Sequence, residues 1–138
     1  MSTEQNKANF RAIPEHILNT GDFDAIDQLF TADYVDHAAL PPGLPDGVEG
    51  VKVFFRMLRS AFPDLHYTVE VVLAEGDLAA GHVSVTGTHK GEFMGIPPTG
   101  KQLRWTETHM GRLVDGKLAE HWGDYDQLGM LQQLGVMG

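Results

Sequence analysis

Three ionisable side chains in the last third of the chain, Glu107, His109 and Asp124, occur at a spacing that suits proton transfer. Residues 102–114 alternate as expected for a β-strand, and this alternation places Glu107 and His109 on one face. A carboxylate in apolar surroundings is a stronger base than in water, and a neighbouring imidazole can donate a hydrogen bond to an enolate or alkoxide oxygen. The pattern therefore indicates acid/base chemistry next to a carbonyl group.

The Asp-Gly pair at 115–116 predicts how the last two strands meet. Asp-Gly is a preferred sequence for a two-residue hairpin, in which the flanking residues pair and the register follows by counting outward. This register sets His109 opposite Trp122 and Glu107 opposite Asp124. We therefore expect both carboxylates and the histidine on one face. The spacing leaves open a second interpretation, in which these residues form a buried polar cluster with satisfied hydrogen bonds or lie on the solvent face of a half-exposed sheet.

Several other residues are candidates for the walls of a cavity. His37 ends a short predicted strand before a Pro-rich loop, at a position that suits a cavity mouth. The GEFMGIPPTG loop has the composition of a turn-rich connection between two strands, and Met94 and Ile96 on it could act as an apolar lid. His121 is expected to face away from the proposed site, because successive strand residues point to opposite faces. The predicted substrate-binding residues are His37, Trp105, Trp122, Phe55 and Met94.

The elements that must position these residues change type near residue 65. Before it, apolar residues recur at helical spacing; after it, they alternate. Helices are expected over 10–21, after Asp22 and over 51–62, with a short strand at 34–37. Strands are expected at 66–73, 78–89, 102–114 and 117–125, and Asp126 is expected to cap a closing helix. Helices followed by strands indicate an α+β fold, in which a curved sheet wrapped around helices would enclose a cavity.

Composition restricts the possible partners. The chain has 138 residues, which is typical of one domain, and a net charge of −9. Nucleic acids and anionic membranes attract basic surfaces, so we expect neither as a partner. No apolar run approaches the ~20 residues that a membrane span needs. The first ten residues show no basic segment leading into an apolar stretch, so we expect no signal peptide and a cytoplasmic location.

Motifs for metals and cofactors are missing from the sequence. There is no cysteine, which excludes thiolate zinc sites and a cysteine nucleophile. We find no H-E-x-x-H, no H-x-H pair, no G-x-S-x-G and neither of the glycine-rich nucleotide motifs. We therefore expect no metal and no cofactor in the reaction.

Five segments together resemble the SnoaL-like polyketide (ester) cyclases, which belong to the superfamily sharing the nuclear transport factor 2 fold. They are YVDH, AFPDL, GTHKGEFMGIPPTGK, DGKLAEHW and DQLGMLQQLG, and the resemblance extends from Phe10 to Gly135. It implies a single domain over 1–138 and a cone-shaped α+β barrel. In that fold a curved antiparallel sheet wraps around N-terminal helices, a short helix closes the chain, and two copies usually pair through their sheets.

The resemblance also implies roles for individual residues. These cyclases close a ring by intramolecular aldol condensation, with an Asp on the last strand as general acid/base, and Asp124 matches that position best. His109 matches their His on the preceding strand. Glu107 stands where those cyclases have Gln, which is a departure from the pattern. His37 matches the His of the first-strand segment and would line the pocket.

We derive three functional hypotheses. In the first, Asp124 removes a proton next to the carbonyl group of a small hydrophobic ester or ketone, and His109 stabilises the enolate. In the second, the same pocket supports hydrolysis or dehydration, with Asp124 or Glu107 activating water. In the third, the chain binds a small ligand without converting it. Replacing Asp124 with Asn should abolish turnover in the first hypothesis and alter affinity at most in the third.

Overall fold

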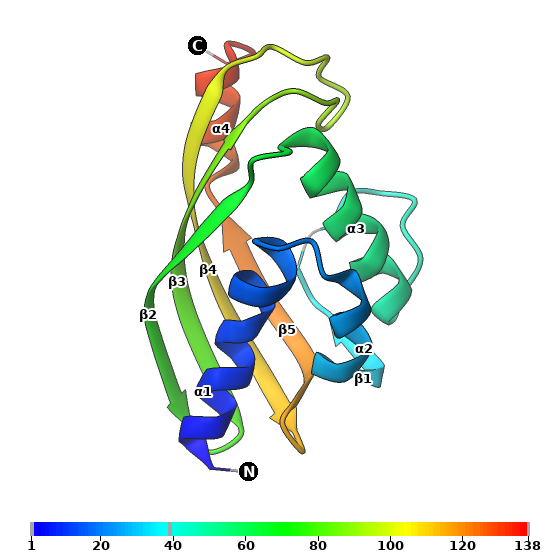
Figure 1. Ribbon diagram of the computed structural model, residues 1–138, viewed down its shortest axis with the longest axis vertical. Helices are drawn as coiled ribbons and strands as arrows, with labels where there is room; N and C mark the ends of the chain where they lie inside the picture. Colours follow the sequence, from blue (N-terminus) through cyan, green and yellow to red (C-terminus); the bar gives the residue numbers. More distant parts are fainter. Residues whose placement is uncertain (1, 39, 138) are drawn as a thin grey trace.

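The computed structural model, which describes residues 2–38 and 40–137, is a five-stranded curved sheet with helices packed on one side (Figure 1). The strand order is β1-β5-β4-β3-β2. The strands are β1 (Phe30–Asp36), β2 (His66–Glu75), β3 (Leu78–Thr88), β4 (Gln102–Val114) and β5 (Lys117–Tyr125). The expected α+β class and the four long strands are confirmed.

Two details of the sheet differ from the expectation of an antiparallel barrel. β1 runs parallel to β5, whereas the other neighbours are antiparallel. β1 and β5 are joined by most of the chain, so no hairpin imposes an antiparallel direction on this pair. Within the described residues, β1 and β2 form the two edges, so the sheet curves around its contents without closing into a barrel.

The helices cover the concave side of the sheet, with α1 packed on β2 and β3 and α3 packed on β1 (Figure 1). They are α1 (Thr3–Ala12), the π-helical η1 (Ile13–Leu18), the 3₁₀-helical η2 (Phe23–Ala25), α2 (Ile26–Leu29), α3 (Gly47–Ala61) and α4 (Gln127–Leu134). No helix in the part of the chain that the structure describes is long and apolar enough to cross a membrane.

Local sequence explains where the principal helices start and stop. α1 begins at a capping box between Ser2 and Gln5. Pro14 lacks a backbone N–H, and the helical path changes there from α to π. Asp126 accepts a hydrogen bond from the Gly129 N–H at 2.9 Å, which confirms its expected role as the cap of α4.

The loop from His89 to Lys101 is attached to the end of α3. The N–H groups of Lys90 and Gly91 both donate to the carbonyl oxygen of Ala61. Phe93 packs edge-on against Phe62, with ring centroids 5.2 Å apart, and Phe62 is fully buried. These contacts join the loop to the core between α3 and the sheet.

One irregularity in β5 determines which side chains face the helices. Counting outward from the turn, Leu113 of β4 pairs with Leu118 of β5, but Arg112, one residue further along β4, pairs with Glu120. Ala119 is therefore an extra residue in β5, and a β-bulge of this kind bends the strand and shifts its register by one.

Candidate active site

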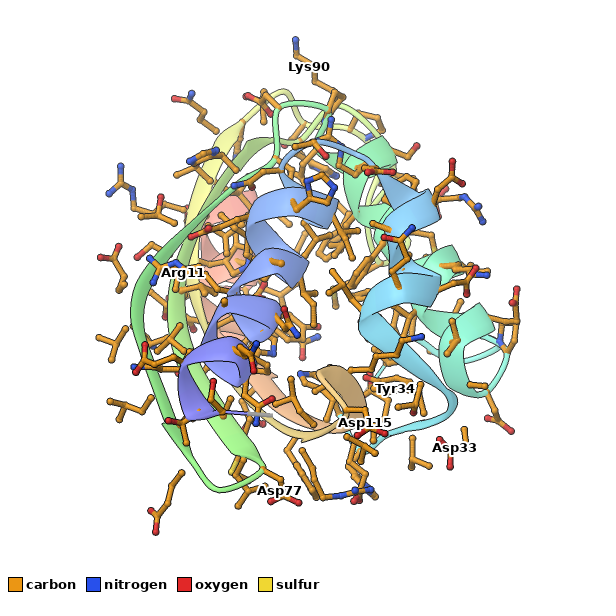
Figure 2. All side chains as sticks on the ribbon, turned by 60° about the horizontal axis from the view of Figure 1, so that its bottom comes forward. Arg11, Asp33, Tyr34, Asp77, Lys90 and Asp115 are labelled. Carbon is orange, nitrogen blue, oxygen red and sulfur yellow. The ribbon has the colours of Figure 1, made fainter. Side chains whose placement is uncertain are left out.

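A cavity of about 260 Å³ lies between the helices and the concave face of the sheet. Viewed from the end that carries the turns at Asp77 and Asp115, side chains from α1, α3 and the sheet converge on this interior (Figure 2). Most of the lining is aliphatic or aromatic. The polar and ionisable side chains of the lining come mainly from β1, β2, β4 and β5, and include Tyr34, Asp36, Tyr67, Glu107, His109 and His121.

Four of these groups form a continuous chain of hydrogen bonds. Nε2 of His109 lies 2.8 Å from Oε1 of Glu107, and its Nδ1 lies 2.8 Å from Nε2 of His121. Nδ1 of His121 in turn lies 3.0 Å from Oδ1 of Asp36. The network thus alternates as carboxylate, imidazole, imidazole, carboxylate, and it crosses from β4 through β5 to β1.

The second carboxylate oxygen of Glu107, Oε2, accepts two further hydrogen bonds. The indole N–H of Trp105 donates to Oε2 at 2.8 Å, and the Tyr67 hydroxyl donates to the same atom at 3.2 Å. Burial and the negative charge of Glu107 raise the pKa of Tyr67, so the hydroxyl keeps its proton. The carboxylate side chain is only 10% exposed, whereas that of His109 is 28% exposed. His109 is therefore the more accessible member of the pair.

Asp36 forms the other end of the network. The Tyr34 hydroxyl donates to Oδ2 at 2.6 Å, and the Ala38 N–H donates to Oδ1 at 2.8 Å. Burial opposes the charge of Asp36, but hydrogen bonding to His121, the charge of that ring and the bond from Tyr34 hold the pKa of the carboxyl below its usual value. Burial and the bond to Asp36 raise the pKa of Tyr34.

The lowered pKa of Asp36 predicts an effect on acid stability. A carboxyl whose pKa is lower in the folded than in the unfolded state contributes stability above its unfolded value of 3.8, and this contribution is lost as the pH falls through the folded value. We expect Asp36→Asn to be less stable than wild type near neutrality and to lose less stability on acidification. Urea denaturation between about pH 6 and pH 3 measures the difference. Parallel curves for the two proteins would contradict it.

The expected register of the last hairpin is wrong beyond Arg112. His109 lies opposite Gly123 and Glu107 lies opposite Tyr125, because the bulge at Ala119 shifts β5 by one residue. Since side chains alternate between faces, the slip exchanges the two faces of the strand.

His121 therefore faces the site, contrary to expectation, and it bonds His109 directly. Trp122 is opposite Met110 and Asp124 is opposite Thr108, on the outer face. Asp124 is exposed and borders the cavity at its rim. The structure does not bring it to His109.

His37 is not among the residues that line the cavity. Its Nε2 lies 2.8 Å from Oε2 of Glu120, and its ring stacks on Trp122 with centroids 4.9 Å apart. Glu120 also accepts a bond from Arg112 at 2.7 Å. The bonds from Arg112 and His37 lower the pKa of Glu120. This cluster lies on the outer face, because His37 and Trp122 follow residues of the inner face by one position.

Of the three remaining residues predicted to form the cavity wall, two line the cavity and one does not. Trp105 and Phe55 line the cavity. Met94 does not: it is 40% exposed and sits in a turn closed by the hydrogen bonds between Phe93 and Ile96. Met94 has a positive φ of 53° and its Sδ lies 4.0 Å from the hydroxyl of Tyr125, whereas Phe93 lines the cavity.

Four residues of the network were missed in the sequence, namely Tyr34, Asp36, Tyr67 and His121. A usable signal existed for the first two, since they are two residues apart in one predicted strand segment and so share a face. His121 carried no such signal, because its face depends on the bulge. No group of three metal-ligating side chains with suitable geometry occurs in residues 2–38 and 40–137.

Comparison with known proteins places this geometry in context. The family model for SnoaL-like polyketide cyclase matches residues 7–134. Nogalonic acid methyl ester cyclase of Streptomyces nogalater is 32% identical over 121 residues, which make up 86% of this chain and 89% of that protein. Aklanonic acid methyl ester cyclase DnrD of Streptomyces peucetius is also 32% identical, over 85% of this chain and 82% of that protein.

Two solved structures are also similar to this chain in both fold and sequence. AclR of Streptomyces galilaeus, for which hydroxylase activity has been suggested, superimposes with a TM-score of 0.86 at 32% identity, covering 99% of this chain and 89% of that one. IdmH of Streptomyces antibioticus, a suggested polyketide cyclase, has a TM-score of 0.82 at 36% identity, covering 96% of this chain and 99% of that one.

Fold and cavity together define the class: an α+β protein of the nuclear transport factor 2 type, with a chamber between its helices and a curved sheet. Within that class, the chain belongs to the SnoaL-like polyketide cyclase family.

Proposed function

We propose that this protein closes a ring in a small hydrophobic ester by an intramolecular aldol reaction, using acid/base groups of its own chain. The observation that carries the proposal is the contact between Glu107 and His109 at the polar end of an otherwise apolar cavity. A base and a hydrogen-bond donor held side by side in a poorly solvated site are what enolate formation requires. The methyl ester cyclases among the relatives support the substrate class.

The reaction uses the two residues in sequence. Glu107 takes a proton from the carbon next to one carbonyl group, which breaks the C–H bond and leaves an enolate. Once Glu107 is protonated, the Nε2–H of His109 donates its hydrogen bond to the enolate oxygen. The enolate carbon then bonds to a second carbonyl carbon of the same molecule, and the resulting alkoxide takes a proton from the site. The product is an isomer of the substrate.

Neighbouring side chains prepare the site for this role. Trp105 and Tyr67 hold one carboxylate oxygen of Glu107, which leaves the other oxygen to the substrate and His109. Phe55 and Trp105 supply apolar walls that accept a flat hydrophobic substrate. The assignment of Asp124 as base stays a prediction, and its exposed position opposite Thr108 favours Glu107 instead.

The test is turnover of nogalonic and aklanonic acid methyl esters, the compounds named in the activities of two relatives. We expect a product of unchanged mass and altered retention time, and, with substrate deuterated at the carbon next to the carbonyl group, loss of one deuterium from that carbon. Loss of water would indicate a dehydratase, and loss of the methyl group with uptake of labelled oxygen from water would indicate a hydrolase. Gain of an oxygen atom would indicate a hydroxylase, the activity suggested for AclR. Tight binding of either ester without conversion would indicate a protein that binds a small ligand and catalyses no reaction on it.

We also propose that two copies pair through the outer face of the sheet. That face exposes large apolar side chains on three adjacent strands: Val71, Leu73, Leu78 and Met110 are 51%, 67%, 41% and 40% exposed. Patches of this kind on a sheet usually meet a partner. Sedimentation at micromolar concentration should give a dimer, and Leu73→Asp should shift it toward monomer. A wild-type monomer would contradict the pairing. The cytoplasmic location stays a prediction.

A further inference from the structure

The hydrogen bond between His109 and His121 restricts how many protons the two rings hold. Nδ1 of His109 and Nε2 of His121 lie 2.8 Å apart, and the rings are stacked with centroids 5.0 Å apart. Two bare lone pairs repel at this distance, and two N–H groups exclude each other. One proton therefore lies between the facing nitrogens.

The two outer nitrogens face carboxylates. Nε2 of His109 meets Glu107, and Nδ1 of His121 meets Asp36. Each carboxylate already accepts two further hydrogen bonds from the neighbours described above. A carboxylate surrounded by donors is an acceptor, so the ring nitrogens supply the protons of both outer bonds.

We infer that His109 and His121 hold three protons on their four ring nitrogens and share a single positive charge. Two neutral rings would carry only two protons and leave one of the three hydrogen bonds without a proton. Asp36 and His121 act here as positioning residues, because they keep an N–H on the Nε2 of His109. That role in the reaction rests on the proposed function, whereas the proton count does not.

The charged surroundings of the pair favour this state. Arg11, the one cationic side chain that reaches the cavity among the described residues, is exposed and paired with Glu15 at 2.7 Å. Its position on α1 is visible in Figure 2. Among the lining residues of η1, α3 and α4 none is ionisable. The other titratable groups that reach the cavity are Tyr34 and Asp36 on β1, Tyr67 on β2, Glu107 on β4, and Asp124 and Tyr125 on β5.

The shared charge completes the proton balance of the aldol step. The alkoxide formed on ring closure takes a proton from Nε2 of His109, which forms the product O–H bond and leaves the pair neutral. The proton that Glu107 removed from carbon then passes to the same nitrogen across their 2.8 Å contact. The site returns to its starting state without a proton from water.

Gly123 provides a way to separate the two rings without changing any charge. It lies opposite His109, and a Cβ at this position would fall 2.6 Å from Nδ1 of His109 and 2.8 Å from Nε2 of His121. The atoms in the way are the ends of side chains, so Gly123→Ala should displace the rings and leave the strand in place.

The first test counts protons in the free protein by ¹⁵N NMR of the imidazoles. At neutral pH we expect three protonated nitrogens on His109 and His121 and a strongly downfield proton between the rings. In Gly123→Ala the downfield proton should disappear. Two protonated nitrogens in wild type, or an unchanged spectrum in Gly123→Ala, would overturn the inference.

The second test follows the pH dependence of kcat with the ester that wild type converts. The pair of His109 and His121 loses its positive charge as the pH rises, so kcat should fall on the alkaline side of its pH profile. Asp36→Asn removes a negative charge 3.0 Å from His121 and should move the alkaline limb of the kcat profile to lower pH. Asp33→Asn, an exposed change on the same strand, should leave the limb in place. A lower kcat in Asp36→Asn with an unmoved limb would reduce Asp36 to a structural role and overturn the inference.

The two tests separate this inference from the proposed function. Three protonated nitrogens together with no conversion of either ester would retain the shared charge and reject the cyclase activity. Conversion of an ester by a protein with two neutral rings would retain the activity and reject the shared charge.

Discussion

Replacing Glu107 by Gln is expected to lower kcat by about 10²- to 10⁴-fold, the range associated with a single general base. The amide oxygen can still accept the bonds from Trp105 and Tyr67, so the side chain should stay in place. Its NH₂ group has no lone pair available for the substrate proton. Loss of deuterium from substrate labelled next to the carbonyl group should fall in parallel with ring closure, because both need the same proton transfer.

The decisive comparison is with Asp124→Asn. Both variants lose one carboxylate from the rim or end of the same cavity, but only Glu107 contacts His109. We expect a much smaller loss for Asp124→Asn. If that variant were inactive and Glu107→Gln were active, the base would be the residue on the last strand, as the sequence resemblance implies. Circular dichroism and the unfolding midpoint of both variants establish that the proteins are folded.

Replacing Phe62 by Ala should reduce the free energy of unfolding by about 3–5 kcal/mol, a large part of the roughly 5–15 kcal/mol available to a domain. Phe62 follows α3, is fully buried, and contacts Phe93, His89 and Trp105 with ring centroids 5.2–5.8 Å apart. Its removal leaves a cavity where α3, the loop after β3 and β4 meet. Because Trp105 holds Glu107, activity should fall as well, even in the fraction that remains folded.

A matched control is available on α3, the helix that Phe62 follows. Met57 in α3 is 41% exposed, and Met57→Ala should change the free energy of unfolding by no more than about 0.5 kcal/mol. Urea denaturation of wild type and both variants gives the comparison. A change below about 1 kcal/mol for Phe62→Ala would mean that the three aromatic contacts contribute little, contrary to the packing described here.

Much of the fold could be read from residue patterns because the relevant interactions are local. The apolar spacing of residues 51–62 predicts a helix that the structure places at Gly47–Ala61. The Asp-Gly turn at 115–116 lies between β4 and β5 as expected. Alternation within β4 correctly places Trp105, Glu107 and His109 on one face. Each of these depends on neighbours within a few positions in the chain.

The residues of β5 and β1 that complete the site depend on the tertiary structure and could not be predicted from local patterns. The single extra residue at Ala119 moves His121 to the inner face and moves Trp122 and Asp124 away from His109. Nothing in the alternation of β5 reveals the slip, because a period of two looks the same from either face. Asp36 reaches His121 only because β1 pairs with β5 from 85 residues away. Local residue patterns therefore predict the principal strands, the long helix and the face of β4 that carries Glu107 and His109, whereas a one-residue bulge and a long-range strand pairing set the partners of that face.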